Sequence, residues 1–203
     1  EGVKVGKTIN NFYQNGKPYE ETLHINENEE KVILYFENGN KESETHNILI
    51  DEFEWVIKSY ICWSEDGIKL IEEYRNDKGE KDGDWCEWNE KGEKSGERNY
   101  KGGKQHGLQL RFWSDGGEKL SEEYYKNGVK DGLSTDWYSS GGKWVARSFK
   151  NGIEDGLSTE WYQNGKKKIE KNYKDGKEDG LWTEWGEDGK KTYQGTFKDG
   201  NEQ

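Results

Sequence analysis

One sequence unit of about 24 residues recurs along most of this chain, and that period restricts the fold more than any other feature. Segment 133–156 reads LSTDWYSSGGKWVARSFKNGIEDG, segment 157–180 reads LSTEWYQNGKKKIEKNYKDGKEDG, and the chain continues from 181 with LWTEWGEDGKKTYQGTFKDG. Each copy holds an aromatic-bearing run, a glycine turn, a second run that ends in Tyr or Phe, and a link closed by an acidic residue and glycine. This arrangement predicts a β-hairpin and its connection to the next hairpin.

The glycine of the first turn in each unit measures the period. These glycines are Gly16, Gly39, Gly67, Gly92, Gly116, Gly141, Gly165 and Gly189, at spacings of 23 to 28 residues. The links between units contain Asn-Gly or Asp-Gly pairs, which reach the positive φ angles of tight hairpin turns. The sequence therefore predicts an all-β fold: an elongated single-domain array of about eight stacked antiparallel hairpins, with atypical units at its ends.

The first strand of each regular unit carries one fixed aromatic position. It is filled by Trp63, Trp88, Phe112, Trp137, Trp161 and Trp185. Two and four residues earlier, on the same face of a strand, stand Thr135 and Leu133 in one unit, and their equivalents Thr159, Leu157, Thr183 and Leu181 in the next two. We expect this stripe to form the buried side of the sheet. The opposite face, with Asp136, Glu160 and Glu184, is expected to be polar.

The units differ in regularity along the chain. Residues 61–203 form the regular repeats, and residues 1–60 are expected to be irregular repeats that cap the same sheet. Residues 32–36 (VILYF) predict a strand, and the apolar segment 47–63 favours strands over a short helix because β-branched and aromatic residues dominate it. Cys62 and Cys86 fall on opposite faces when the repeats are aligned, so no disulfide between them is expected.

The composition agrees with a folded repeat protein of acidic character. Only 29% of the 203 residues are hydrophobic and 36% are charged, but 14% are aromatic, ten of them Trp, and aromatic residues recur in register along the units. The formal net charge of −11 disfavours nucleic acid and anionic lipid headgroups as partners. A basic protein partner is easier to accommodate, and the alternative is that the surplus of Asp and Glu serves solubility. No apolar run is long enough to cross a bilayer, so direct membrane insertion is not expected.

The residues offer little for catalysis or for metal binding. His24, His46 and His106 are the three histidines, and no nucleophile motif stands near them. Link acids such as Asp175 and Asp179 lack the alternating ligands of a calcium loop. We therefore expect no enzyme activity, no metal site and no cofactor.

Three segments carry a resemblance to a known family: DGLWTEWGEDGKK (179–191), KNYKDGKEDG (171–180) and WYQNGKKKIE (161–170). They resemble the variant MORN repeat of bacterial proteins, including YwqK-type antitoxins, and the resemblance is strong from about Ile61 onward. It implies stacked hairpins in an elongated sheet, and roles as antitoxin or immunity partners or as exported or surface-associated proteins. It transfers no catalytic residues. The Gly-Gly turns at 116–117 and 141–142 and His106 depart from the pattern.

Positions that depart from the repeat are the candidate partner-binding residues. Trp85 and Trp182 occupy a position that holds Gln or Ser in other units, where packing at the end of the array is the alternative to a binding patch. Trp113 and His106 complete the set. The sequence favours a protein-binding or scaffold module, exported or surface-associated in a bacterium. The chain starts at Glu1 without an initiating Met, which fits either a removed leader or a trimmed sequence. The alternative is a cytosolic antitoxin that binds a toxin. A lower-ranked possibility is a fibre subunit that self-associates through its sheet edges.

Overall fold

The computed structural model describes residues 6–52, 54–114 and 117–203. The chain divides into two compact units, Glu1–Lys104 and Gln105–Gln203, and each is described here by itself. The regular secondary structure of the described residues consists of β-strands alone. Within these ranges there is accordingly no helix long and apolar enough to cross a membrane. The expected boundary at residue 60 separates irregular repeats from regular ones, and it stays a prediction.

Unit 1 contains the first eight strands of the chain. They are β1 (Gly6–Phe12), β2 (Pro18–Asn26), β3 (Glu29–Tyr35), β4 (Lys41–Leu49), β5 (Trp55–Trp63), β6 (Lys69–Arg75), β7 (Lys81–Trp88) and β8 (Lys94–Lys101).

Unit 2 contains the remaining nine strands, the first of which begins at the unit boundary. They are β9 (Lys104–Phe112), β10 (Lys119–Lys126), β11 (Val129–Trp137), β12 (Lys143–Lys150), β13 (Ile153–Trp161), β14 (Lys167–Lys174), β15 (Lys177–Trp185), β16 (Lys191–Lys198) and β17 (Asn201–Glu202).

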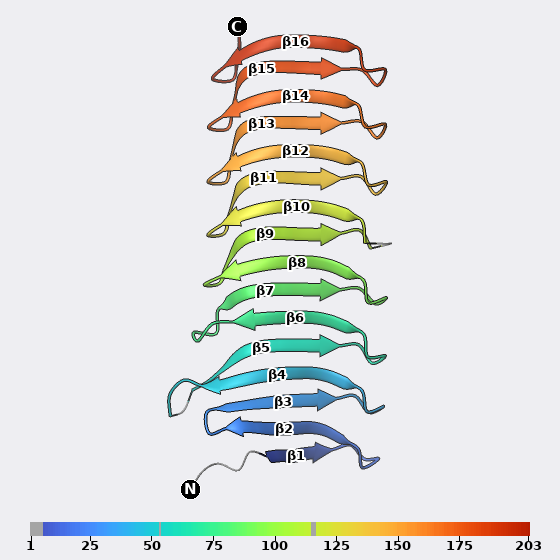
Figure 1. The fold of residues 1–203 in the computed structure, drawn as a ribbon, viewed down its shortest axis with the longest axis vertical. Helices are drawn as coiled ribbons and strands as arrows, with labels where there is room; N and C mark the ends of the chain where they lie inside the picture. The colour runs from blue at the N-terminus through green and yellow to red at the C-terminus, as the bar shows by residue number, and fades with distance from the viewer. Residues whose placement is uncertain (1–5, 53, 115–116) are drawn as a thin grey trace. The chain divides into compact units, whose positions relative to one another are not determined.

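Within each unit, every strand pairs antiparallel with the strand that follows it (Figure 1). Glycine turns join the two strands of a hairpin at one end, and links join successive hairpins at the other. The described strands β1–β16 make eight hairpins, so the predicted all-β fold of stacked antiparallel hairpins is confirmed. The segments 32–36 and 47–63 contribute to β3, β4 and β5, which confirms the preference for strands there.

The turns have the backbone that their sequences predict. In the links, Asn127, Asn151, Asp175 and Asp199 have φ angles of 50–53°, and each precedes a glycine of positive φ, as a type I′ turn requires. Seven of the eight turn glycines also have positive φ; the eighth, Gly116, lies outside the described residues, and its neighbour Gly117 has φ 78°. Glycine is favoured at such positions because it lacks a Cβ.

The expected burial of the whole Leu-Thr-Trp stripe is wrong for its leucines. Thr135, Thr159 and Thr183 are only 3–5% exposed, whereas the exposed fractions of Leu133, Leu157 and Leu181 are 44–47%. Each threonine lies between a Leu and a Trp of its own strand and between two neighbouring strands, which cover its small side chain. Each leucine is covered by neighbouring residues on fewer sides, so almost half of its side-chain surface is exposed to solvent.

The expectation of one aromatic face and one polar face is also corrected. Val145 is 2% exposed and pairs with Asp136 and with Glu160 on the face that was expected to be polar. The aromatic residues that close the second strands lie on this face as well, because alternation along the hairpin places them opposite the Trp stripe. Burial raises the pKa of Asp136 there. Both faces therefore contain apolar packing.

The cysteines lie as the repeat alignment predicts. Cys62 pairs with Ile71, and Cys86 pairs with the next residue of the same strand, Glu72. Successive residues of a strand point to opposite faces, so the two thiols lie on opposite sides of the sheet. Both cysteines are free, and burial raises the pKa of the Cys86 thiol.

Candidate partner-binding surfaces

The four candidate residues occupy separate places in the hairpins. Trp85 lies in β7 of unit 1, and within unit 2 His106 lies in β9, Trp113 directly follows β9, and Trp182 lies in β15. All four are partly buried. The geometry around each one decides what it can contact.

Trp182 is the centre of an aromatic cluster at the C-terminal hairpin. Its ring lies 4.9 Å from the ring of Phe197 and 6.0 Å, edge to face, from that of Tyr193. The Lys171 ammonium lies 3.6 Å from the Trp182 ring centroid, within cation–π range, and Nε1 of Trp182 donates to Glu184 at 3.0 Å. The indole N–H and at least one ring face are therefore already occupied.

Trp85 has a similar environment with one difference. The Lys81 ammonium lies 3.0 Å from its ring centroid, and Tyr100 packs at 5.9 Å. Burial lowers the pKa of Lys81, and the charges of Arg75 and Arg98 lower it further, against the opposing effect of Glu73. Unlike Trp182, the Trp85 Nε1 is buried without a hydrogen-bond partner in the part of the chain that the structure describes. A buried donor of this kind costs about 1–3 kcal/mol.

His106 stands where other links have an aspartate that binds the next link. Asp82, Asp131 and Asp155 accept hydrogen bonds at 3.1–3.2 Å from backbone N–H groups twenty residues further on. His106 makes no such bond among the described residues, and its Nδ1 is buried and unpartnered. The link after His106 is held by the backbone bond from Gly128 N–H to the Gln105 carbonyl at 2.8 Å.

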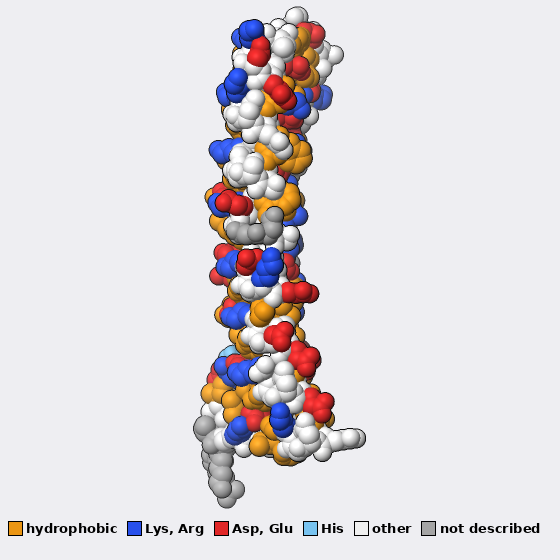
Figure 2. All heavy atoms as spheres, turned by 90° about the vertical axis from the view of Figure 1, so that its right-hand side faces the viewer, with side chains coloured by type: hydrophobic (Ala, Val, Ile, Leu, Met, Phe, Trp, Pro, Cys, Tyr) orange, Lys and Arg blue, Asp and Glu red, His pale blue; other side chains and the backbone are white. Residues whose placement is uncertain are grey.

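Trp113 lines a pocket of about 270 Å³ at the glycine-turn ends of β9–β12. The other lining residues are Leu120, Trp137, Tyr138, Ser139 and Trp144. The Trp113 Nε1 is buried and has no hydrogen-bond partner within the described ranges. The side chain of Trp144 is 49% exposed, although Trp is the largest of the apolar residue types. In Figure 2, which faces the turn side, hydrophobic side chains reach the surface around this height of unit 2.

The Trp stripe itself is covered by lysines. Lysines at the starts of second strands lie over the rings of Trp63, Trp88, Trp137, Trp161 and Trp185 at 5.2–5.9 Å from the centroids. Several of these lysines also bind a glutamate three residues on, as Lys119 binds Glu122 at 2.6 Å. Lys143 has Ala146 at that position instead, so it has no such carboxylate. The stripe is thus mainly a structural ladder of cation–π pairs.

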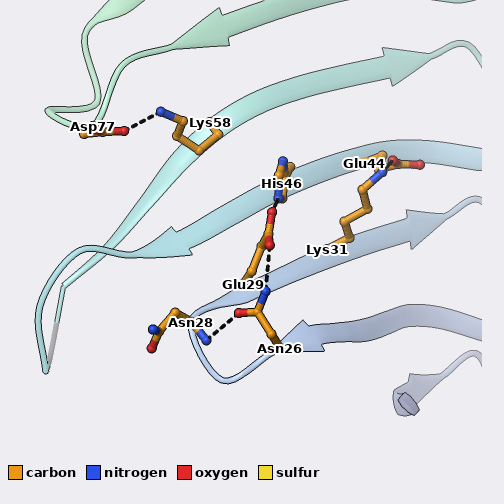
Figure 3. Close-up of polar contacts among 8 residues, drawn as sticks. All are labelled: Asn26, Asn28, Glu29, Lys31, Glu44, His46, Lys58 and Asp77. Carbon is orange, nitrogen blue, oxygen red and sulfur yellow. Dashed lines mark hydrogen bonds and ion pairs between the residues drawn. The ribbon is translucent and has the colours of Figure 1, made fainter. Parts of the chain in front are cut away.

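The histidine that is most closely bound to a carboxylate takes part in a structural network (Figure 3). His46 Nε2 lies 2.7 Å from Glu29, and Asn26 Nδ2 donates to the same carboxylate at 2.8 Å. Asn26 also accepts from the Asn28 backbone N–H, which closes the β2–β3 turn. Among the described residues, no group of three or more His, Cys, Asp or Glu side chains is arranged to hold a metal ion.

A comparison with protein families identifies the repeat. The sequence model of the MORN repeat variant matches residues 154–175 and 178–199. The chain carries MORN-type repeats. No curated protein matches the chain significantly. MORN-type repeats are associated with scaffolds that bind proteins or membranes, and such scaffolds are typically not catalytic. The two matched repeats cover β13–β16 and contain one candidate residue, Trp182.

Four residues of the Trp113 pocket were not singled out from the sequence: Leu120, Tyr138, Ser139 and Trp144. Leu120 and Trp144 stand three residues after Gly117 and Gly141, at a position that holds Ser95, Lys168 or Thr192 in three other units and Leu70 in another. Tyr138 also lines the pocket, and its hydroxyl donates to the Trp161 carbonyl at 2.8 Å. The apolar residues at this position in two consecutive units, Leu120 and Trp144, are a sequence signal that could have found the pocket.

Proposed function

We propose that this protein is a non-enzymatic protein-binding scaffold, exported or surface-associated in a bacterium. The observation that carries the proposal is the row formed by Leu133, Leu157 and Leu181, with exposed fractions of 44–47%. They occupy equivalent positions of three successive hairpins, so neighbouring leucines are two strand spacings, about 9.4–9.8 Å, apart. Apolar side chains repeated in this way on one face are typical of a surface that binds protein.

The electrostatics favour a basic partner. The formal net charge is −11, and a surface of this sign attracts cationic partners and speeds their association. The candidates Trp85, Trp182, Trp113 and His106 add aromatic and polar contacts in places where the repeat pattern is broken. The nucleic acid and membrane classes are disfavoured by the same charge.

The test compares two variants of the full chain in affinity capture from the native source, with mass spectrometry to identify captured proteins. One variant replaces Leu133, Leu157 and Leu181 with Ser. The matched control replaces Lys126, Lys150 and Lys174 with Ser, which are also exposed and repeat-equivalent. We expect wild type and control to capture the same protein and the leucine variant to lose it. Equal capture by both variants would contradict the proposal, provided that circular dichroism shows both to be folded.

A cytosolic antitoxin is the alternative, favoured by the negative charge, which suits occlusion of a basic toxin. A toxin gene beside this one, and recovery of its product in the capture experiment, would support it over the scaffold role. Self-assembly is a lower-ranked alternative. The short β17 pairs only with Phe197 and Lys198 of β16, so much of that strand's outer edge has no strand partner in the described structure. Growth of light scattering with concentration would reveal it.

A further inference from the structure

The Trp113 pocket is built at two β-bulges. In β10, Lys119 pairs with Phe112 and Ser121 with Arg111, which leaves Leu120 unpaired between them. In β12, Lys143 pairs with Trp137 and Val145 with Asp136, which leaves Trp144 unpaired. Bulges direct side chains away from the regular alternation. The same bulge recurs at this end of other hairpins, for example between Glu160 and Trp161, so the pocket depends on the residues that occupy it. Both bulged residues line the pocket.

The spacing of the lining residues suits one kind of peptide backbone. Trp113 and Tyr138 occupy equivalent positions of consecutive hairpins, as do Leu120 and Trp144, so each pair is about 9.4–9.8 Å apart along the stacking direction. A polyproline II helix has three residues per turn and rises about 9.3 Å per turn. Every third side chain of such a helix would therefore meet successive aromatic or apolar positions of the groove. Aromatic-lined grooves are the usual binding sites of proline-rich segments.

A carboxylate beside the groove adds a negative charge. Glu118 lies beside the groove: its backbone carbonyl accepts from the Trp113 N–H at 2.9 Å, and its carboxylate lies close to Gly141. The Glu118 carboxylate has no ion-pair partner among the described residues. With the net charge of −11, this site complements an Arg or Lys of the bound segment.

We propose that the groove formed by Trp113, Leu120, Trp137, Tyr138 and Trp144 binds a basic proline-rich segment in the polyproline II conformation. The prolines pack between the aromatic rings, and a basic side chain pairs with Glu118. This inference rests on the proposed protein-binding function and names the class of partner and the surface that it uses.

The probe is a synthetic peptide of about twelve residues that repeats Pro-x-x-Pro and carries Arg beside its last proline. It is titrated into the full chain and followed by tryptophan fluorescence and by backbone amide NMR shifts. We expect saturable binding that Trp144→Ala weakens by about tenfold or more, since a central aromatic contact dominates such interfaces. Trp113→Phe, which keeps an aromatic ring in the groove, should weaken it less. Trp55→Ser, at an exposed Trp of β5 outside the groove, should leave binding unchanged.

Three results would overturn the inference: no saturable binding, equal binding of a peptide with its prolines replaced by alanine, or equal affinity of Trp144→Ala and wild type. The Arg contact has its own test. A peptide with Glu in place of Arg should bind wild type more weakly than the Arg peptide does, and this loss of affinity should be smaller for the Glu118→Gln variant. Failure here is distinct from failure of the proposed function. The leucine-row capture experiment can succeed while the peptide does not bind, and that result would reject only the proline-rich partner.

Discussion

The carboxylate of Asp155 accepts a hydrogen bond from the backbone N–H of Asp175 at 3.2 Å, twenty residues further along the chain. Asp131 does the same for Asn151 at 3.1 Å. In each case, the acidic residue before a link glycine holds the first residue of the next type I′ turn. The acidic residue that precedes the link glycine therefore connects successive links, in addition to shaping the turn in which it stands.

Asp155→Ala should lower the free energy of unfolding by about 1 kcal/mol, the usual contribution of one such hydrogen bond. The matched control is Asp155→Asn, which keeps an acceptor oxygen at the same place and should retain most of the stability. Urea unfolding followed by tryptophan fluorescence would measure both. Equal losses in the two variants would show that charge, and not the acceptor, matters at this site.

Gly180→Ala should be more damaging, by about 1–3 kcal/mol, because Gly180 has φ 123° and an added Cβ would lie 3.1 Å from the Asn172 Cβ. Gly142→Ala is the control, since a Cβ there meets nothing within 4 Å and the backbone is not left-handed. Thermal unfolding of both variants would compare them. A larger loss at Gly142 would contradict the assigned role of the link glycine.

The sequence was sufficient for the hairpins because glycine position and side-chain alternation are local properties. The turn at Asn151-Gly152 and the opposite faces of Cys62 and Cys86 follow directly from them. The exposure of a side chain does not follow from these local properties, because it depends on how many neighbours cover that side chain. For this reason the expectation that Leu157 is buried beside Thr159 is wrong. The pocket was missed for a related reason: simple alternation has no place for the unpaired bulge residue Trp144.

Val145→Ala should lower the free energy of unfolding by about 2 kcal/mol, because this side chain is 2% exposed and its loss leaves a cavity. The same substitution at Val129, which is 44% exposed, should cost less than about 0.5 kcal/mol. Chemical denaturation of the two variants would measure the difference. Similar losses at both positions would contradict the burial of Val145 on the face of Asp136 and Glu160.

Tyr35 should titrate late, with consequences for stability at high pH. Burial and the hydrogen bond to Glu21, at 2.8 Å, raise the pKa of Tyr35 to about 12. The unfolded chain would lose this proton near pH 10, so the contribution of Tyr35 to stability is complete below about pH 10 and is lost as the pH rises towards 12. NMR titration of the tyrosine ring carbons, with Tyr35→Phe to assign the signal, would measure the pKa. Glu21→Gln should lower it in part, since burial remains, and an unchanged value would contradict the contribution of the carboxylate.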